Sequence, residues 1–127
     1  MSERIKNALQ NIGIPCYFLT RGKNNVECIV YNYISSPLYY ADNTIKATRY
    51  TVLLNVYLKA NRDIEQMKAD ILETMREYGF QGGTMATTMP ETTNDGLVLF
   101  NTPITFNTFM NEIEGGNYDL WVKRLQE

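Results

Sequence analysis

The chain has 127 residues, with 14 acidic and 12 basic side chains and a formal net charge of −2. This length suits a single domain around one hydrophobic core. Its densest basic group is the pair Lys123 and Arg124, which argues against a surface built to grip DNA, because such a surface needs several clustered cations.

The first predicted element is a short helix over residues 3–12, where apolar residues recur at helical spacing. Ser2 is a suitable N-cap, because its hydroxyl can accept a hydrogen bond from the first turn. Gly13 and Pro15 should end the helix. The pattern therefore predicts one amphipathic helix with a single buried face.

Two strands are predicted next. Residues 26–34 alternate like a strand, but both sides carry large apolar groups, including Tyr31 and Tyr33, so we expect partial cover on both faces. Residues 46–58 give the clearest alternation in the chain. One of its faces consists of Tyr50, Val52, Leu54, Val56 and Leu58.

The strand over residues 46–58 is long for a chain of this size. It would reach about 43 Å at about 3.3 Å per residue, whereas a compact domain of this length spans roughly 35 Å. Either the strand bends or bulges within the fold, or its Asp42–Asn43 end projects beyond the domain together with residues 31–40. The sequence leaves both alternatives open.

The strongest helical pattern covers residues 64–78. Asp63 or Asn61 can cap its start, and Gly79 suits the position just past its end. The apolar stripe consists of Ile64, Met67, Ile71, Leu72, Met75 and Tyr78.

The remaining chain is less regular. Residues 81–96 look like a loop with a weak strand over 84–89, and residues 97–110 predict a strand that is broken or bulged at Pro103. Residues 110–127 form a C-terminal extension. The sequence therefore predicts one α+β domain over 1–127, in the order α-β-β-α-β-β, with a mixed or antiparallel sheet, two main helices packed on it and a long projecting β-hairpin.

Few residues offer catalytic chemistry. The chain contains no histidine, the commonest general base, and Cys16 and Cys28 cannot complete a zinc site by themselves. We expect two reduced thiols of an intracellular protein. Acidic residues over 70–77 are interleaved with basic ones, which is typical of a solvated helix flank. We therefore expect no catalytic residue, no cofactor and no metal.

No membrane segment is predicted either. The N-terminus lacks an apolar signal region, and no run of 18 apolar residues occurs. We expect a soluble product that is made in the cytoplasm and contacts no membrane.

The nine tyrosines are more numerous than usual for this length. Tyrosine is favoured in protein interfaces, because its ring is rigid and carries a polar tip. On a projecting hairpin, Tyr31, Tyr33, Tyr39 and Tyr40 would serve self-association or docking. The alternative is that these rings cover the open face of the sheet within one chain.

Three segments resemble the tail-terminator (tail-completion) proteins of long-tailed bacteriophages, which act in the phage neck. They are "PLYYADNTIKATRYTVLLNVYLK", "IEQMKADILETMREYGF" and "VLFNTPITFNTF". The likeness covers residues 1–109, a family-like core, and leaves 110–127 with Trp121 as an extension beyond the usual end. No residue among them is a chemical signature.

The resemblance implies an α+β structural virion protein without enzymatic activity or cofactor. It implies a ring, usually a homohexamer, that caps the head-proximal end of the tail tube, stops its polymerisation and offers a surface for head–tail joining. The implied partners are the chain itself, the major tail tube protein and the head–tail connector or stopper, while genomic DNA passes through the lumen without sequence-specific binding. The implied location is the virion tail, assembled in the bacterial cytoplasm.

The resemblance also suggests residues for contacts between subunits or with the tube, around the loop of residues 38–46. The expected interface residues are Tyr31, Tyr33, Leu38, Tyr39, Tyr40, Asp42, Asn43, Lys46 and Arg49. A related head–tail connector or stopper is the alternative within the same class. A small cytosolic binding module that uses the aromatic sheet face belongs to another class, and an enzyme with an unrecognised site comes last.

Overall fold

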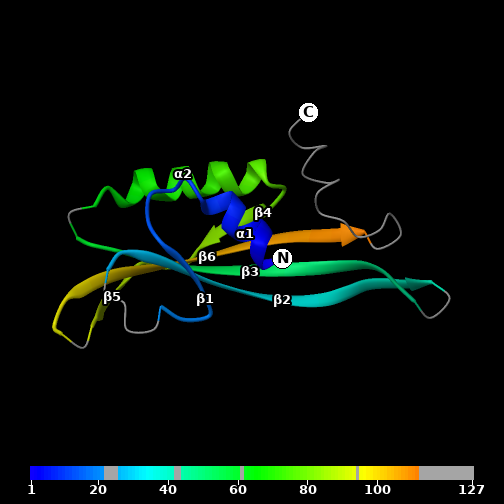
Figure 1. Ribbon diagram of the computed structural model, residues 1–127, viewed down its shortest axis with the longest axis horizontal. Helices are drawn as coiled ribbons and strands as arrows, with labels where there is room; N and C mark the ends of the chain where they lie inside the picture. The colour runs from blue at the N-terminus through cyan, green and yellow to red at the C-terminus, as the bar shows by residue number, and fades with distance from the viewer. Residues whose placement is uncertain (22–25, 42–43, 61, 94, 112–127) are drawn as a thin grey trace.

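The computed structural model describes residues 1–21, 26–41, 44–60, 62–93 and 95–111, with side chains for all of these except 38–46 and 111. The described elements are α1 (Ser2–Leu9), β1 (Cys16–Phe18), β2 (Cys28–Ala41), β3 (Thr44–Leu58), α2 (Ile64–Glu77), β4 (Gln81–Met85), β5 (Met89–Thr92) and β6 (Val98–Asn111). Two helices lie on one face of a mixed six-stranded sheet, so the fold is α+β (Figure 1).

The sheet has the strand order β1-β2-β3-β6-β4, and β5 pairs with β6 beside β4. β1 runs parallel to β2, whereas the other pairs are antiparallel. The three long strands β2, β3 and β6 thus form the centre, and the short strands lie at the two edges. We call the side that the helices cover the helix face and the other side the open face.

The hairpin of β2 and β3 is the longest feature of the fold. Its register runs from Cys28 opposite Tyr57 to Ala41 opposite Thr44, with irregularities that skip Leu38 and Lys46. Figure 1 shows that one end of this hairpin extends past both helices. The long predicted strand therefore both contains an irregularity and projects.

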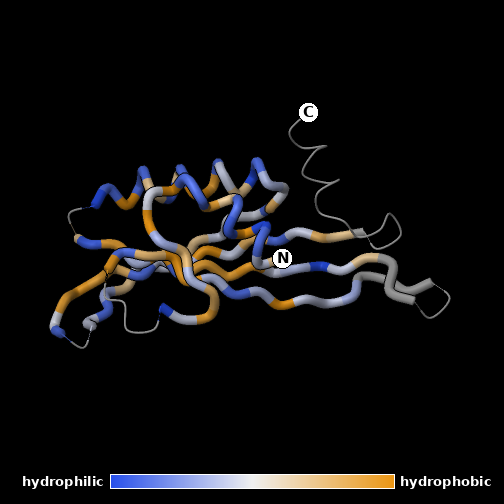
Figure 2. Tube along the Cα trace, in the orientation of Figure 1, coloured by the Kyte–Doolittle hydropathy of each residue, from blue (hydrophilic) through white to orange (hydrophobic). Residues whose placement is uncertain are grey.

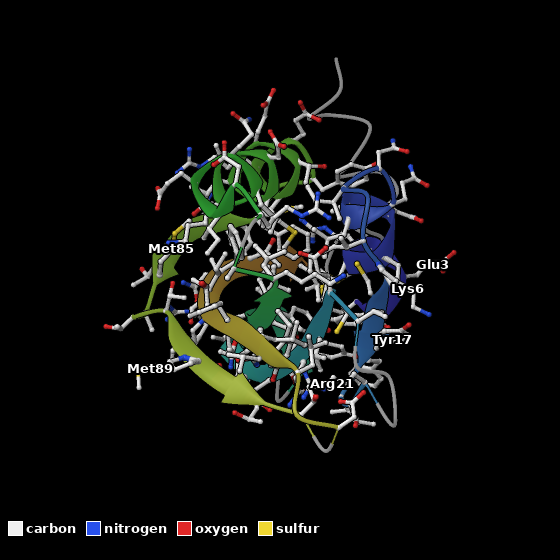
Figure 3. The ribbon with its side chains drawn as sticks, turned by 90° about the vertical axis from the view of Figure 1, so that its left-hand side faces the viewer. Glu3, Lys6, Tyr17, Arg21, Met85 and Met89 are labelled. Atoms are coloured by element: carbon white, nitrogen blue, oxygen red, sulfur yellow. The ribbon has the colours of Figure 1, made fainter. Side chains whose placement is uncertain are left out.

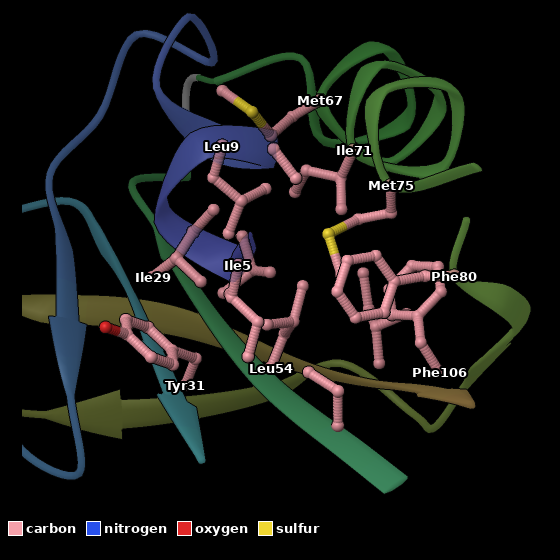
Figure 4. Close-up of a cluster of buried hydrophobic side chains, with 14 of the residues drawn as sticks. Ile5, Leu9, Ile29, Tyr31, Leu54, Met67, Ile71, Met75, Phe80 and Phe106 are labelled. Atoms are coloured by element: carbon pink, nitrogen blue, oxygen red, sulfur yellow. The ribbon is translucent and has the colours of Figure 1, made fainter. Parts of the chain in front are cut away.

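The core lies between the helices and the helix face of the sheet (Figure 4). Met67, Ile71 and Met75 of the predicted α2 stripe are buried there. Asp63 caps α2 as predicted, because its side chain accepts from Gln66 N at 3.0 Å. The matching alternate residues of β3, which are Val52, Leu54, Val56 and Leu58, are all at most 1% exposed.

Arg4 joins α1 to α2 and β6. Its side chain is fully buried and donates from Nη2 to the Tyr78 carbonyl at 2.6 Å and to Thr108 Oγ1 at 3.0 Å. The guanidinium also lies over the Phe80 ring, 4.5 Å from its centroid. Because the Tyr78 carbonyl lies at the end of α2, the cation also meets the negative end of the helix dipole.

The strand count differs from the prediction. The sequence pattern missed β1 and the start of β4, and the predicted strand over residues 84–89 in fact spans the gap between β4 and β5. The first helix ends at Leu9 rather than at residue 12. The observed order is therefore α-β-β-β-α-β-β-β.

The predicted break at Pro103 is wrong, because β6 keeps an unbroken register with β3 through the pair Asn55 and Pro103. The Pro103 carbonyl accepts from Ala86 N at 2.9 Å, on the side of β4 and β5. The nitrogen of a strand residue faces the same side as its carbonyl. The missing N–H of Pro103 therefore falls at the gap between β4 and β5 and removes no bond to β3.

Candidate interaction surface

The two ends of the sheet differ, and at the first of them part of the open face is buried as well as the helix face. Figure 3 views this closed end and places Arg21 on the side of the sheet away from the helices. Arg21 Nη2 lies 3.2 Å from Glu91 Oε1, and its guanidinium stacks 4.4 Å from the Tyr57 ring centroid. At the same end of the sheet, Cys28 and Leu99 are fully buried.

A second ion pair ties the same end to the helix layer. Arg62 Nη2 lies 2.7 Å from Glu27 Oε1, and the backbone N–H of Lys59 donates to Glu27 Oε2 at 2.9 Å. The pKa of Glu27 is lowered from its ordinary value, chiefly because Arg62 donates a hydrogen bond to its carboxylate. The start of β2 is thus fixed to the connection between β3 and α2.

The opposite end of the sheet, which we call the arm, consists of residues 32–41, 44–53 and 105–111 of β2, β3 and β6. The register places alternate residues of the three strands on its open face. Ile34 is 61% exposed and Phe109 is 45% exposed there. Within the described side chains, the open face of the arm consists of Asn32, Ile34, Ser36, Arg49, Thr51, Leu53, Thr105, Asn107 and Phe109.

Arg49 is the one charged residue in that set, and it lies among neutral polar side chains. Asn107 Oδ1 accepts from Arg49 Nη2 at 3.5 Å and from Thr51 Oγ1 at 3.3 Å. The outer side of α2 is different, since hydrophilic residues recur along it (Figure 2). A flat, nearly uncharged face with exposed Ile34 and Phe109 has the character of a contact surface.

The outer edge of β2 is also open along the arm. Within the described strands, β1 pairs with β2 only from Ile29 to Tyr31. The Leu19 N–H still reaches the Tyr31 carbonyl at 2.9 Å, but Leu19 has a φ of +69°, where the chain leaves the strand direction. From Asn32 onward, β2 is therefore the edge strand of the sheet that the described residues form, and a strand of a partner can extend it.

The predicted interface residues separate into three groups. Tyr31 is fully buried, and its hydroxyl lies 2.7 Å from Ser2 Oγ. The prediction for Tyr31 is therefore wrong, since a side chain inside the protomer core is not available to a partner. Arg49 is exposed on the open face. Tyr33 is partly exposed. Its ring stacks on that of Phe18, with the centroids 5.7 Å apart, and its centroid lies 6.0 Å from that of the Tyr50 ring.

Four of the remaining predicted residues lie near the end of the hairpin. The backbones of Leu38, Tyr39, Tyr40 and Lys46 belong to β2 and β3, and their side chains are outside the description. Asp42 and Asn43 lie outside the described residues. Their interface role stays a prediction.

The sequence reasoning missed three exposed apolar residues, which are Ile34 and Phe109 on the arm and Phe18 at the end of β1. The alternating pattern of the sequence placed Ile34 on an apolar side of its strand. Only the arrangement of the sheet shows that neither described helix covers this side. Phe18 lies in the strand that the pattern did not predict. Tyrosine content drew attention to β2, where Tyr31 is buried and Ile34 is exposed.

The described residues carry little reactive chemistry. Burial raises the pKa of Cys16 to about 11 and also raises that of Cys28, so both thiols are protonated and weakly nucleophilic at neutral pH. Within the described residues, no group of three or more His, Cys, Asp or Glu side chains is placed to hold a metal ion. Asp70, Glu73 and Glu77 are exposed along α2.

No protein-family model and no curated protein matches this sequence. Neither of the described helices is long and apolar enough to cross a bilayer.

Proposed function

We propose that the chain is a structural protein of a tailed bacteriophage, a ring-forming tail terminator. It caps the head-proximal end of the tail tube, stops polymerisation of the tube and offers the surface for head–tail joining. The ring is a hexamer of this chain, its partners are the tube protein and the head–tail connector or stopper, and DNA passes through its lumen. The protein resides in the neck of the virion.

One observation carries this proposal. The hairpin of β2 and β3 continues past both helices and ends in the segment that resembles the terminator family (Figure 1). A hairpin that leaves its own core gains little for the stability of the protomer, so its length is best explained by contacts with other subunits. Among the described side chains, the open face of the arm carries Arg49 as its single charge, which supports the same use.

The low density of positive charge supports the assignment of DNA as cargo. A ring that DNA must slide through is hindered by clustered lysine and arginine, because each phosphate contact adds to retention. On the described arm only Arg49 offers such a charge on the open face, and Asn107 engages it.

The test is the double variant Tyr39→Ser, Tyr40→Ser, supplied to a phage that lacks its own copy of this protein. We expect a folded chain, because the pair lies at the hairpin end beyond the helices, and we expect tails of uncontrolled length in electron micrographs. Tails of normal length that fail to join heads would instead identify the related connector or stopper.

The matched control is Met89→Ser, which removes a side chain 59% exposed on β5. It should leave tail length and head joining unchanged. A Tyr39→Ser, Tyr40→Ser variant that unfolds, or one that forms normal, joined tails, would overturn the proposal.

A further inference from the structure

The open edge of β2 has a defined extent, which we call the edge window (Asn32–Ser36). At one end, the Tyr31 carbonyl already accepts from Leu19 N, so β1 covers the edge there. At the other end stands Pro37, which has no backbone N–H to offer. The register irregularity follows directly, between Pro37 and Tyr39. A partner strand therefore has room along the window and along no described residue before it.

Backbone direction within the window follows from the bonds to β1. Ile29 N donates to the Pro15 carbonyl at 2.8 Å and the Tyr31 carbonyl accepts from Leu19, so Ile29 and Tyr31 face outward. Alternate residues of a strand share this direction, which turns the N–H and C=O groups of Tyr33 and Ser35 toward the open edge. Asn32 Oδ1 occupies the Tyr33 N–H at 2.8 Å, as a local substitute for a neighbouring strand.

We propose that the edge window pairs antiparallel with the edge window of a second copy of this chain, around a two-fold axis at Ile34. Tyr33 of one copy then faces Ser35 of the other, and each such pair exchanges both backbone hydrogen bonds once the Asn32 side chain swings away. The two Ile34 residues meet as the intervening pair without hydrogen bonds, where side chains of opposed strands lie closest.

Three features select a second copy as the occupant. The window is bounded symmetrically about Ile34, because Tyr31 and Pro37 come opposite each other in this register: the Tyr31 carbonyl already accepts from Leu19 N, and Pro37 has no N–H. The window carries no charge, so two copies meet without repulsion. On the helix face, the large Tyr33 side chain is matched with the small Ser35, while the two Ile34 side chains, each 61% exposed, cover one another on the open face.

The pairing goes beyond the proposed ring and does not depend on it. A two-fold contact joins like with like and closes at two copies, whereas a ring repeats a contact between unlike surfaces. A strand pair this short belongs to the small interfaces that bury less than about 1,200 Å² in total. The dimer should therefore dissociate on dilution. Its formation can be tested with the purified full chain alone.

The experiment is oxidation of the variants Ile34→Cys and Ser36→Cys with diamide, which takes two electrons and two protons from two thiols as the disulfide forms. Opposed residues of a pair without hydrogen bonds have Cα atoms about 4.5 Å apart, within the disulfide range of about 4.4–6.8 Å. The two Ser36 positions are offset by four residues, about 13 Å. We expect Ile34→Cys to form crosslinked dimers at least ten-fold faster than Ser36→Cys.

Background crosslinking through the native cysteines should be low, because their thiols are partly or fully buried and burial raises their pKa. Equal crosslinking rates for the two variants would overturn the proposal, since random collision or another register would then explain them. In sedimentation, the unmodified chain should dimerise as its concentration rises. Ser35→Pro, which removes only an outward N–H, should keep the fold and abolish the dimer; a chain that stays monomeric throughout the series contradicts the pairing.

Discussion

The closed end and the arm of this sheet are built from the same three long strands and differ in what covers them. At the closed end, Arg21 and Glu91 meet across the open face, and Cys28 and Leu99 are fully buried beneath them. At the arm, Ile34 on the continuation of the same strand is 61% exposed. Side chains on the open face are thus buried at one end of the strands and exposed at the other, and we propose that the exposed end serves contacts outside the protomer.

The largest effect should come from the core that supports both ends. Ile71→Ala removes a fully buried side chain of α2 and should lower the free energy of unfolding by about 2–5 kcal/mol through the cavity it leaves. Ile34→Ala on the arm should change it by no more than about 0.5 kcal/mol. Urea unfolding followed by circular dichroism measures the free energy of unfolding of both variants. Similar losses of this free energy in the two variants would contradict the distinction between core and arm.

A smaller effect tests the ion pair at the closed end. Because the hydrogen bond from Arg62 lowers the pKa of folded Glu27 below its unfolded value, the pair stabilises the fold above the ordinary glutamate pKa of about 4.3. This contribution is lost as the pH falls through the lower, folded value. The stability difference between the unmodified chain and Glu27→Gln should therefore be present at pH 7 and shrink in acid.

The control for this experiment is Glu65→Gln, whose side chain is 88% exposed and lies 3.6 Å from Lys68 Nζ. Exposed pairs of this kind contribute little to stability, so its difference from the unmodified chain should stay small at every pH. A Glu27→Gln difference that is constant from neutral pH into acid would show that Arg62 is not the main partner of the carboxylate.

The elements with strong periodicity were predictable from the sequence. Alternation over residues 46–58 gave most of β3, and the Asp63 cap with the stripe through Ile71 gave α2 nearly to the residue. These patterns are local, because each records one face buried against the same core. They required no knowledge of the neighbouring strands.

Other features depend on what lies beside a strand. β4 contains glycines that predict a loop, yet the backbone at Gly83 favours glycine through its φ of +93°, and a Cβ there would also crowd the Leu72 side chain of α2. Pro103 looks like a break, but its missing N–H faces the gap between β4 and β5. β1 is too short to show a period. None of these neighbours can be read from a local pattern.

The candidate surface shows the same limit. The sequence pointed to the tyrosine-rich strand, but residue type alone could not separate Tyr31, which bonds to Ser2 inside the core, from Tyr33, which lies at the edge of the arm. Ile34 is exposed because it lies on the open face of the sheet, which neither described helix covers. The sequence could therefore indicate a candidate region, but not which of its side chains are exposed.

The most direct test compares amide hydrogen exchange in the free chain and in purified tails. If the arm carries the contacts, peptides that cover residues 32–41 should exchange much more slowly in tails, and peptides that cover β4 and β5 should change little. Equal exchange of residues 32–41 in both states, with new protection at the closed end instead, would contradict the account.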